Sequence, residues 1–339
     1  MRYIGGDFAQ CDLARCLRKG NDTFDFFLTS SEYKPMYFET ASDGLAAMID
    51  EITKDSSAEI FFPDNYCRQT IKVILGKATN KNVTVTFYDQ LKSLLKLQNK
   101  QDSIKILLIM HFNSVFDQEA IRSFEELDSR FVLIEDFVQH PLEISKRKGK
   151  YSINSLRKIL PLDVAVCYGL TSKDNYIQDP SDYYKLKRKA ERKKTEFLIN
   201  TSNTDHEKQY LKLFKEAELS LVNDKIYLAQ NLDVEILKTI DFEEILAKRR
   251  KNYKFLYSKL IGLSDIEILP GDYFQMMILT GAQQKIKVKL AEQGIFTSIH
   301  WLDSQTEISR NELSIPIDHR YDLEDMNRIF NNLSKILIG

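Results

Sequence analysis

The sequence predicts an α/β fold: a large N-terminal domain with a mainly parallel sheet, followed by a small C-terminal α+β domain. Three observations support this prediction. Short apolar runs alternate with amphipathic stretches over about the first 170 residues. Residues 181–259 then have the composition of long helices, with no glycine between Gly169 and Gly262. The last 80 or so residues return to a mixture of strand-like and helix-like segments.

Five apolar runs in the first half have the length and residue types of strands buried on both faces. They are Glu59–Phe62, Val83–Tyr88, Ile104–His111, Phe131–Asp136 and Asp163–Tyr168. Amphipathic segments lie between them and are expected to be helices: Gly44–Thr53, Asn65–Gly76, Gln90–Lys96 and Gln118–Leu127. Strands that alternate with helices imply right-handed crossovers, and therefore a mainly parallel sheet.

The second half is expected to begin with long helices and to end in a small mixed domain. Apolar residues recur at helical spacing at Leu211, Leu213, Phe214, Ala217 and Leu221. Strands are expected at Ile266–Leu269, Tyr273–Leu279 and Leu313–Ile317, a helix at Ala282–Gln293 ending at Gly294, and a last helix from its N-cap Asp322 to Ile338. We therefore assign residues 1–200 to an N-terminal segment and the large domain. Residues 201–339 form a helical connection and the small domain.

Composition and charge exclude several classes of protein. The 339-residue chain carries 48 basic and 49 acidic side chains, so it has no overall field to attract nucleic acid or an anionic membrane. No apolar run is long enough to span a bilayer, and the N-terminus does not resemble a signal peptide. The four cysteines lack C-x-x-C spacing and the five histidines lack metal-ligand spacing. We therefore expect a cytoplasmic protein with free thiols and no metal site.

An acid at the end of a predicted strand is the first candidate functional residue. The apolar run Val132–Ile134 leads directly into Glu135 and Asp136. Ligands of open parallel sheets bind at the carboxyl ends of the strands. A carboxylate at that place can stabilise a buried cation, such as a protonated heterocycle. The alternative is that Asp136 only caps the turn that follows.

Two other segments have residue types suited to a Schiff base or to a phosphate. Ser155 and Lys158 are three residues apart, so they share one side of a turn. A lysine beside an apolar run can be desolvated, which lowers its pKa and favours a Schiff base. Thr40, Ala41 and Ser42 open an amphipathic helix, whose free N–H groups and dipole favour a phosphate. The alternatives are a surface Ser/Lys pair and an ordinary N-cap at Thr40 or Ser42.

Six segments, spread over nearly the whole chain, match one known pattern in the right order. They are Ile4-Gly5-Gly6-Asp7-Phe8, Phe62-Pro63-Asp64-Asn65-Tyr66-Cys67, Glu135-Asp136-x-x-Gln139, Ser155-Leu156-Arg157-Lys158-x-Leu160-Pro161, Lys248-Arg249-Arg250-x-Asn252-Tyr253 and Ile315-Pro316-x-Asp318-His319-Arg320-Tyr321. This set resembles the fold-type I pyridoxal-phosphate (PLP) enzymes, and more specifically the DegT/StrS-type sugar aminotransferases. The resemblance implies a three-layer PLP-transferase fold like that of aspartate aminotransferase, in a homodimer with its site near the subunit interface.

The resemblance also implies roles for single residues. Lys158 would form the Schiff base with PLP and move protons, and Asp136 would hold the pyridine nitrogen protonated, which makes the ring an electron sink. Gln139 would bond the phenolic oxygen of the ring. The remaining cofactor-binding residues are Ala41, Ser42 and Ser155 for the phosphate, and Tyr66 (or Cys67) against the ring face.

The activity implied is transamination in polysaccharide biosynthesis. An amino acid, with glutamate the expected donor, would give its amino group to a keto-sugar nucleotide or a similar carbonyl compound. Some enzymes of the family carry histidine in place of the lysine and act as dehydratases, so Lys158 favours transamination.

The sequence departs from the family pattern close to the implied site. Two glycines expected after Leu160-Pro161 are replaced in the stretch Leu162–Ala165, Asp43 stands in the helix start, and His111-Phe112-Asn113-Ser114 lacks a glycine. The chain has 12 glycines, about half the usual share. Two alternatives therefore stay open: a non-catalytic homologue that binds a ligand or partner, and a PLP enzyme with different chemistry on an amino acid.

Two features outside these motifs have ordinary interpretations. The basic run from Lys185 to Lys194 is expected to be a solvated helix face. The alternatives are contact with an anionic substrate, such as a nucleotide diphosphate, or with a membrane surface. His300 and Trp301 follow a predicted strand and are expected in the core, with the mouth of the active site as the alternative.

Overall fold

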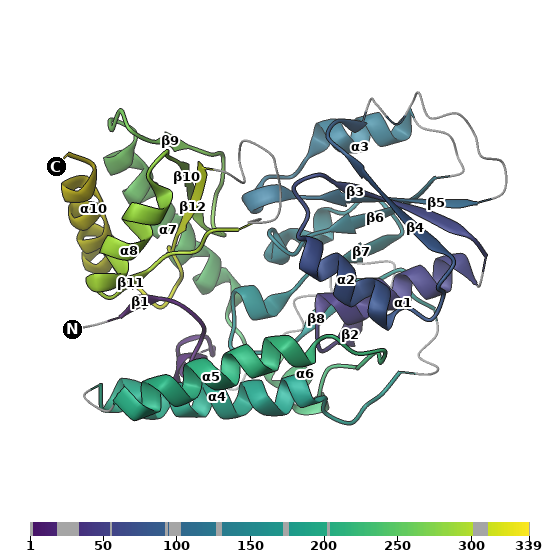
Figure 1. Ribbon diagram of the computed structural model, residues 1–339, viewed down its shortest axis with the longest axis horizontal. Helices are drawn as coiled ribbons and strands as arrows, with labels where there is room; N and C mark the ends of the chain where they lie inside the picture. Colours follow the sequence, from purple (N-terminus) through teal and green to yellow (C-terminus); the bar gives the residue numbers. More distant parts are fainter. Residues whose placement is uncertain are drawn as a thin grey trace.

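The structure, a computed structural model, divides into three parts: a large α/β unit, a small C-terminal unit and a two-helix hairpin beside them (Figure 1). It describes residues 3–18, 34–54, 56–91, 94, 103–126, 131–171, 176–201, 204–300 and 311–338. Part of the predicted helix Gln90–Lys96, and Trp301, lie outside the described residues.

A seven-stranded sheet forms the centre of the large unit, in the order β2-β8-β7-β6-β5-β3-β4. Its strands are β2 (Met36–Phe38), β3 (Ala58–Pro63), β4 (Val83–Tyr88), β5 (Ile104–Met110), β6 (Phe131–Asp136), β7 (Tyr151–Ile153) and β8 (Ala165–Tyr168). All neighbours from β4 to β7 are parallel, and β8 is antiparallel to both β7 and β2. The predicted, mainly parallel sheet is therefore confirmed.

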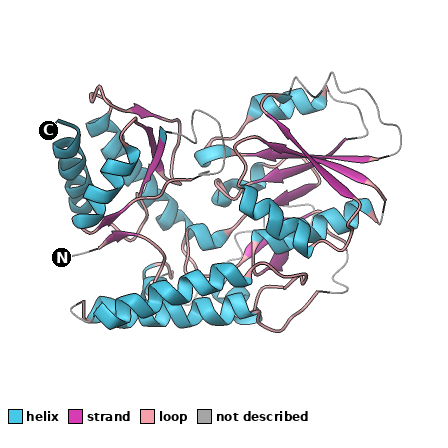
Figure 2. Ribbon diagram, viewed as in Figure 1, coloured by secondary structure: helices cyan, strands magenta, loops and turns pink. Residues whose placement is uncertain are grey.

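Both faces of the sheet are covered, as the continuous apolar runs predict. In β5, Ile106 and Leu108 belong to the cluster that includes helices α1 (Ala41–Thr53) and α2 (Arg68–Lys77). Leu107 and Ile109 point to the other face and pack with α3 (Gln118–Glu125). In Figure 2 the magenta strands of this unit lie between cyan helices. The unit thus has three layers, and the carboxyl ends of its parallel strands form one edge.

The small unit is built on a three-stranded antiparallel sheet in the order β12-β10-β9. Its elements are β9 (Glu267–Ile268), β10 (Met276–Leu279), β12 (Glu312–Ile315), α8 (Gln283–Glu292) and α10 (Leu323–Ile338). As predicted, Asp322 caps α10, because its carboxylate accepts the N–H groups of Glu324 and Asp325. The N-terminal strand β1 (Ile4–Gly5) pairs in parallel with β11 (Ile295–Phe296), so the two ends of the chain meet in this unit.

The long helix α7 (Phe242–Leu260) connects the two units. Its first turns pack on the large unit through Phe242 and Ile245, and its last turns pack on the small unit through Leu256 and Leu260. Short 3-10 helices complete the connections: η1 (Gln10–Arg15), η3 (Phe112–Ser114), η4 (Pro141–Lys146) and η5 (Leu156–Lys158). The four cysteines are free, as predicted.

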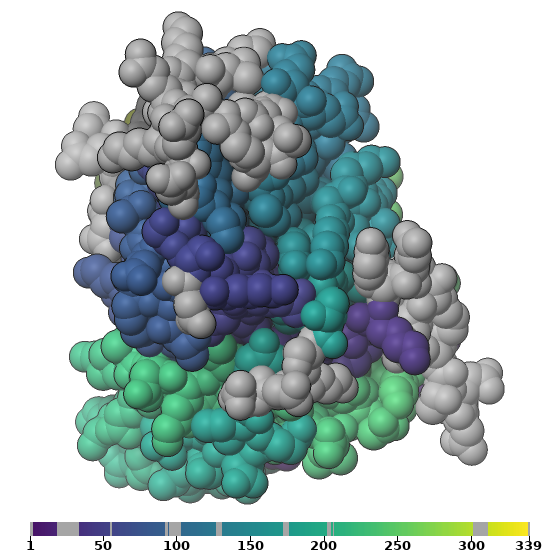
Figure 3. All heavy atoms as spheres, turned by 90° about the vertical axis from the view of Figure 1, so that its right-hand side faces the viewer, coloured from purple at the N-terminus to yellow at the C-terminus, as the bar shows by residue number. Residues whose placement is uncertain are grey.

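The helix-rich middle segment folds into a hairpin of α4 (Asp182–Ile199) and α5 (Thr204–Ser220), followed by α6 (Asn231–Leu237). Figure 3 shows this segment in teal and green below the blue atoms of α1 and α2. The predicted solvated face is wrong for two residues of the basic run, because Lys187 and Lys194 are buried. Among the described helices, none combines the length and apolar character needed to cross a membrane.

Candidate active site

Asp136 ends β6, in the middle of the sheet edge where the parallel strands finish. Its neighbours in register are Met110 at the end of β5 and Ile153 at the end of β7. The carboxylate is buried, and each of its oxygens accepts one hydrogen bond. Oδ1 accepts the backbone N–H of Val138 (2.7 Å), and Oδ2 accepts the hydroxyl of Tyr66 (2.7 Å). Asp136 thus caps the following turn, as one of the two interpretations predicted. Its role toward a buried cation at the strand edge stays a prediction.

The environment of Asp136 is unusual for a carboxylate. Burial raises its pKa, while Tyr66, the N–H of Val138, His111 and Lys158 lower it without outweighing burial. A buried acid in this state is stabilised by a positively charged partner, because an opposite charge favours ionisation. The strand end therefore offers a place for a cationic group.

Lys158 is the last residue of η5, which follows β7 directly. The N–H of Leu156 donates to the carbonyl of Val164 (2.9 Å), and the Leu156 carbonyl accepts from Ile159 (2.9 Å) and Leu160 (2.8 Å). These apolar residues are fully buried, apart from Val164 at 1% exposure. The buried side of the turn fixes the backbone and leaves Lys158 on its open side.

The amine of Lys158 lies in a cavity of about 290 Å³ between η5, the N-terminal segment and the small unit. The side chain of Lys158 is exposed to solvent in this cavity. Desolvation by the surrounding protein still lowers the pKa of Lys158, and Arg157 lowers it further. A lowered pKa increases the fraction of free amine, the form that attacks a carbonyl.

His300 lies on another wall of the same cavity. Its Nε2 is 3.0 Å from Oε1 of Gln275, and its N–H donates to Glu312 (2.7 Å). Burial lowers the pKa of His300 to about 4, and Lys158 contributes to the shift. The imidazole is therefore neutral at pH 7 and available for hydrogen bonding. Of the two positions considered for His300, the cavity is the one observed.

Arg157, the residue before Lys158, connects η5 to the hairpin. Its Nη1 donates to the hydroxyl of Tyr183 on α4 (2.8 Å) and to Oε1 of Glu218 on α5 (2.8 Å). Glu218 also counts among the groups that raise the pKa of Lys158. The long helices thus contribute charge to the site even though none of the family motifs lies on them.

Asp163, at one of the positions where the chain departs from the family pattern, is the centre of a buried ion-pair network. Its carboxylate pairs with Lys187 and Arg188 of α4 and accepts the hydroxyl of Tyr183 (3.0 Å). Burial would raise the pKa of Asp163, but the two cations outweigh burial and lower it. The departure therefore has a structural role, because it fastens α4 to the sheet.

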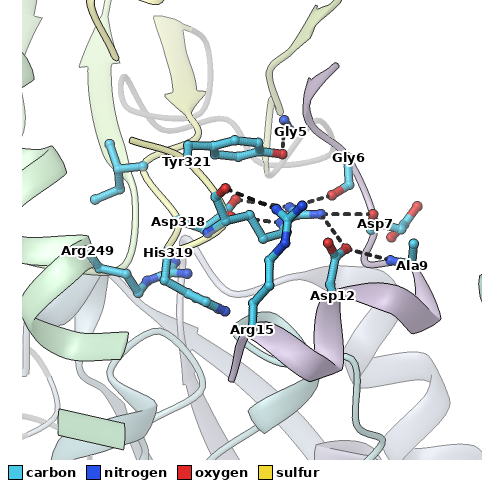
Figure 4. A network of polar contacts seen from close by, with 12 residues as sticks. Gly5, Gly6, Asp7, Ala9, Asp12, Arg15, Arg249, Asp318, His319 and Tyr321 are labelled. Carbon is cyan, nitrogen blue, oxygen red and sulfur yellow. Dashed lines mark hydrogen bonds and ion pairs between the residues drawn. The ribbon is translucent and has the colours of Figure 1, made fainter. Parts of the chain in front are cut away.

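The N-terminal segment forms a wall of the Lys158 cavity and is held in place by Arg320. Figure 4 shows Gly6 and Asp7 of this segment beside Asp318 in the same polar network. Arg320 pairs with Asp318 through Nε (2.7 Å) and Nη2 (3.0 Å), and donates to the carbonyls of Gly6 (3.1 Å) and Asp7 (3.2 Å). Lys194 of α4 also donates to the carbonyl of Asp7. The first and last of the six sequence motifs thus meet in one network beside the cavity.

The start of α1, the expected phosphate end of the site, is closed by a capping box. Thr40 Oγ1 accepts the N–H of Asp43 (3.2 Å), and the Asp43 carboxylate accepts the N–H of Thr40 (3.2 Å). The other oxygen of Asp43 pairs with buried Lys77 (3.0 Å). The charge of Asp43 is therefore compensated inside the protein. Ala41 and Ser42 occupy the first turn, where helix N–H groups are free for a ligand.

Gln139 is tied to the segment that lacks the expected glycine. Its side-chain oxygen accepts the N–H of Asn113 (3.2 Å), and its carbonyl accepts the N–H of Ser114 (2.9 Å). Asn113 and Ser114 have φ angles of 46° and 65°, in the region that favours glycine. The glycine is absent, yet these two residues adopt left-handed backbone angles. The role expected for Gln139 toward a ring oxygen would use its amide nitrogen.

The predicted site residues are partly brought together. Tyr66 contacts Asp136 directly, Lys158 acts on the pKa of Asp136, and buried Ser155 immediately precedes η5. Tyr66 differs from the expectation in one respect: its hydroxyl points at the carboxylate. Sequence reasoning did not single out Arg157 for the site, although it lies between Ser155 and Lys158, since its partner Glu218 is 61 residues away.

Comparison with known structures identifies the fold. Spr1654 of Streptococcus pneumoniae in its PLP form, described as a sugar aminotransferase, superposes with a TM-score of 0.65 at 10% identity, over 99% of this chain and 98% of that one. The chain has the fold of PLP-dependent aminotransferases. The aminotransferase TlmJ of Streptoalloteichus hindustanus gives a TM-score of 0.64 at 11% identity, again over 99% and 98% of the two chains.

PseC of Helicobacter pylori, an aminotransferase in pseudoaminic acid biosynthesis, also shares the PLP-transferase fold. Its TM-score is 0.64 at 12% identity, over 99% of this chain and 98% of PseC. No family model matches the sequence, and no curated protein matches it either. The predicted PLP-transferase fold is therefore confirmed by structure alone, over nearly the full length of the chain.

Proposed function

We propose that the protein is a PLP-dependent aminotransferase that moves an amino group from an amino acid to the carbonyl carbon of a sugar. One observation carries the proposal. An amine with a lowered pKa, Lys158, lies in a cavity and acts on a buried strand-end carboxylate, Asp136, within the PLP-transferase fold. Glutamate as donor and a keto-sugar nucleotide as acceptor are the substrates we propose.

The residues present fit PLP at its two reactive ends. The buried Asp136 carboxylate lacks a cation in contact among the described residues, which suits a protonated pyridine nitrogen. Lys158 supplies the amine, and its open side faces the cavity. When bound, PLP supplies an electrophilic aldehyde and an electron-withdrawing ring.

Each residue then has a distinct task. Lys158 would hold the cofactor through its amine and would move the proton at the Cα of the amino donor. Asp136 would hold the proton on the ring nitrogen. Ala41, Ser42 and Ser155 would bind the phosphate, and the cavity between the small unit and η5 would admit the substrates.

The experiment is to add PLP to the purified protein and follow the visible absorbance of an amine adduct. We expect the band to appear in the wild type and to be lost in Lys158→Ala. Borohydride reduction and peptide mapping would then place the label on Lys158. Glutamate should convert the bound cofactor to pyridoxamine phosphate.

Lys194 provides a matched control for the labelled site. Lys194 is buried, whereas Lys158 is exposed, and burial lowers the pKa of Lys194 to about 8. It donates to the Asp7 carbonyl and lines a different cavity. Lys194→Ala should retain the band. Label on Lys194 instead of Lys158, or a band that survives Lys158→Ala, would contradict the proposal.

A second function is favoured by one observation: the Tyr66 hydroxyl already occupies one oxygen of Asp136. In this alternative the protein keeps the fold but binds a ligand or partner without catalysis. Turnover of an amino donor to its keto acid would exclude it. The proposal also includes a homodimer, which light scattering on the purified protein would test.

A further inference from the structure

Tyr66 and Asp136 form a hydrogen-bonded pair that is shielded from solvent. Tyr66 is 5% exposed and Asp136 is 1% exposed, and 2.7 Å separates the hydroxyl from Oδ2. Burial, followed by the Asp136 charge, raises the pKa of Tyr66 well above its ordinary value. The phenol therefore stays protonated and is the donor, while the carboxylate is the acceptor.

The ring of Tyr66 is anchored in this position by its own segment. Its N–H donates to the carbonyl of Pro63 (2.9 Å), which closes a tight turn at the end of β3. The ring also packs against Phe62, with centroids 5.0 Å apart and an interplanar angle of 43°. Moving the ring onto the face of a cofactor would break the packing contact as well as the bond to Asp136.

Two neutral donors thus hold the carboxylate from opposite segments. Tyr66 binds Oδ2 from the β3 end, and the Val138 N–H binds Oδ1 from the turn after β6. The titratable groups that influence Asp136 are His111 after β5 and Lys158 of η5, and neither forms an ion pair with it among the described residues. Because each oxygen has a second lone pair, the carboxylate can still accept from a ligand.

We propose that Tyr66 is a positioning residue for Asp136: its hydroxyl fixes the carboxylate in one orientation and supports its ionised form, so that a cationic heterocycle meets a preset acceptor. This role replaces the expected one, in which the Tyr66 ring lies against the cofactor. The inference rests on the proposed function for its chemical purpose, but the hydrogen bond can be tested without the cofactor.

The test compares two tyrosine variants of the full chain. Tyr66→Phe keeps the ring and its packing on Phe62 and removes only the hydroxyl. Tyr88→Phe is the matched control, because Tyr88 is also buried at a strand end and donates to the carbonyl of Leu108 (2.7 Å). Protein labelled with ¹³C at the aspartate carboxyls is titrated by NMR, and the Asp136 signal is identified by its loss in Asp136→Asn.

We expect Tyr66→Phe to raise the pKa of Asp136 by about one unit or more, and Tyr88→Phe to leave it unchanged. PLP affinity, measured by equilibrium dialysis, should fall about tenfold in Tyr66→Phe only. An Asp136 titration that is the same in Tyr66→Phe and the wild type would overturn the inference. If the titration shifts as expected but the wild type binds no PLP, Tyr66 retains its positioning role and the proposed function fails.

Discussion

Asp136 and Asp163 are both fully buried carboxylates of the large unit, yet their environments are opposite. Asp163 pairs with Lys187 and Arg188, and their charges lower its pKa despite burial. Among the residues that the structure describes, Asp136 accepts hydrogen bonds only from a phenol and a backbone N–H, and burial raises its pKa. The protein thus compensates one buried charge completely and leaves the other short of positive charge.

The difference separates a structural acid from an acid kept for a ligand. Burying a carboxylate is costly unless a cation accompanies it. At Asp163, two cationic side chains of one helix, Lys187 and Arg188, offset the desolvation of the carboxylate. At Asp136, which lies at the strand edge where ligands of parallel sheets bind, no such cation offsets it among the described residues. We interpret the uncompensated acid as the functional one.

The largest expected effect is the loss of stability when the charge of Asp163 is removed. In Asp163→Asn, Lys187 and Arg188 lose their carboxylate, and the free energy of unfolding should fall by about 3–5 kcal/mol. Asp136→Asn removes a charge that has no counter-ion, so its stability should be equal to or higher than that of the wild type at pH 8. Urea unfolding measures both. Exposed Asp182→Asn on α4 is the control, and similar losses in the two variants would contradict the comparison.

A second prediction uses pH and Glu191, which shares the cations of Asp163. Glu191 lies 3.0 Å from Arg188, and burial raises its pKa to about 7. The unfolded value is about 4.3, so between these values the folded state binds a proton that the unfolded state releases. Lowering the pH from 8 to 5 therefore stabilises the wild type through this group.

Glu191→Gln lacks that contribution. Relative to the wild type, Glu191→Gln should therefore be more stable at pH 8 than at pH 5. The difference in the free energy of unfolding, variant minus wild type, should be about 2 kcal/mol more positive at pH 8. The measurement is urea unfolding at a series of pH values. Glu196→Gln, on the exposed part of α4, is the control and should show no such pH dependence. If the difference between Glu191→Gln and the wild type did not change with pH, the raised pKa of Glu191 would be contradicted.

The smallest expected effect concerns the pKa of Lys158 and the charge of Glu218, which pairs with the neighbouring Arg157. Glu218 pairs with Arg157 at 2.8 Å and raises the pKa of Lys158. In Glu218→Gln the pKa of Lys158 should fall by less than about one unit, because Glu218 is partly solvated. The rate at which Lys158 is acetylated as a function of pH, read by mass spectrometry, reports this pKa. Glu216→Gln on the same helix is the control, and an equal shift there would point to a general charge effect.

Much of the fold follows from local sequence patterns. The predicted bounds of β4 and β6 match the structure. The prediction that β4 is buried on both faces is wrong, because β4 lies at the edge of the sheet and, of its six residues, only Tyr88 is buried. The strands β2 and β7 have three residues each, too few to show a pattern, and were not predicted. The antiparallel direction of β8 depends on its pairing partners, which no local pattern records.

The site was predictable where its residues lie in short motifs and not where distant segments meet. Asp136 and Lys158 stand out in their own segments. The bond from Tyr66 to Asp136 joins residues 70 positions apart, and the burial of Lys187 depends on Asp163 across 24 positions. The sequence of a basic run is the same whether its side chains face water or buried acids. The burial of Lys187 and Lys194 could therefore not be predicted from the sequence.

The left-handed residues Asn113 and Ser114 show that a loop of this shape can be built without glycine. Their backbone shape is maintained by the bond from Asn113 to the Pro270 carbonyl and by Gln139, rather than by a flexible residue. A search of the sequence for glycine would therefore miss this turn, in a chain that shares its fold with solved structures at 10–12% identity.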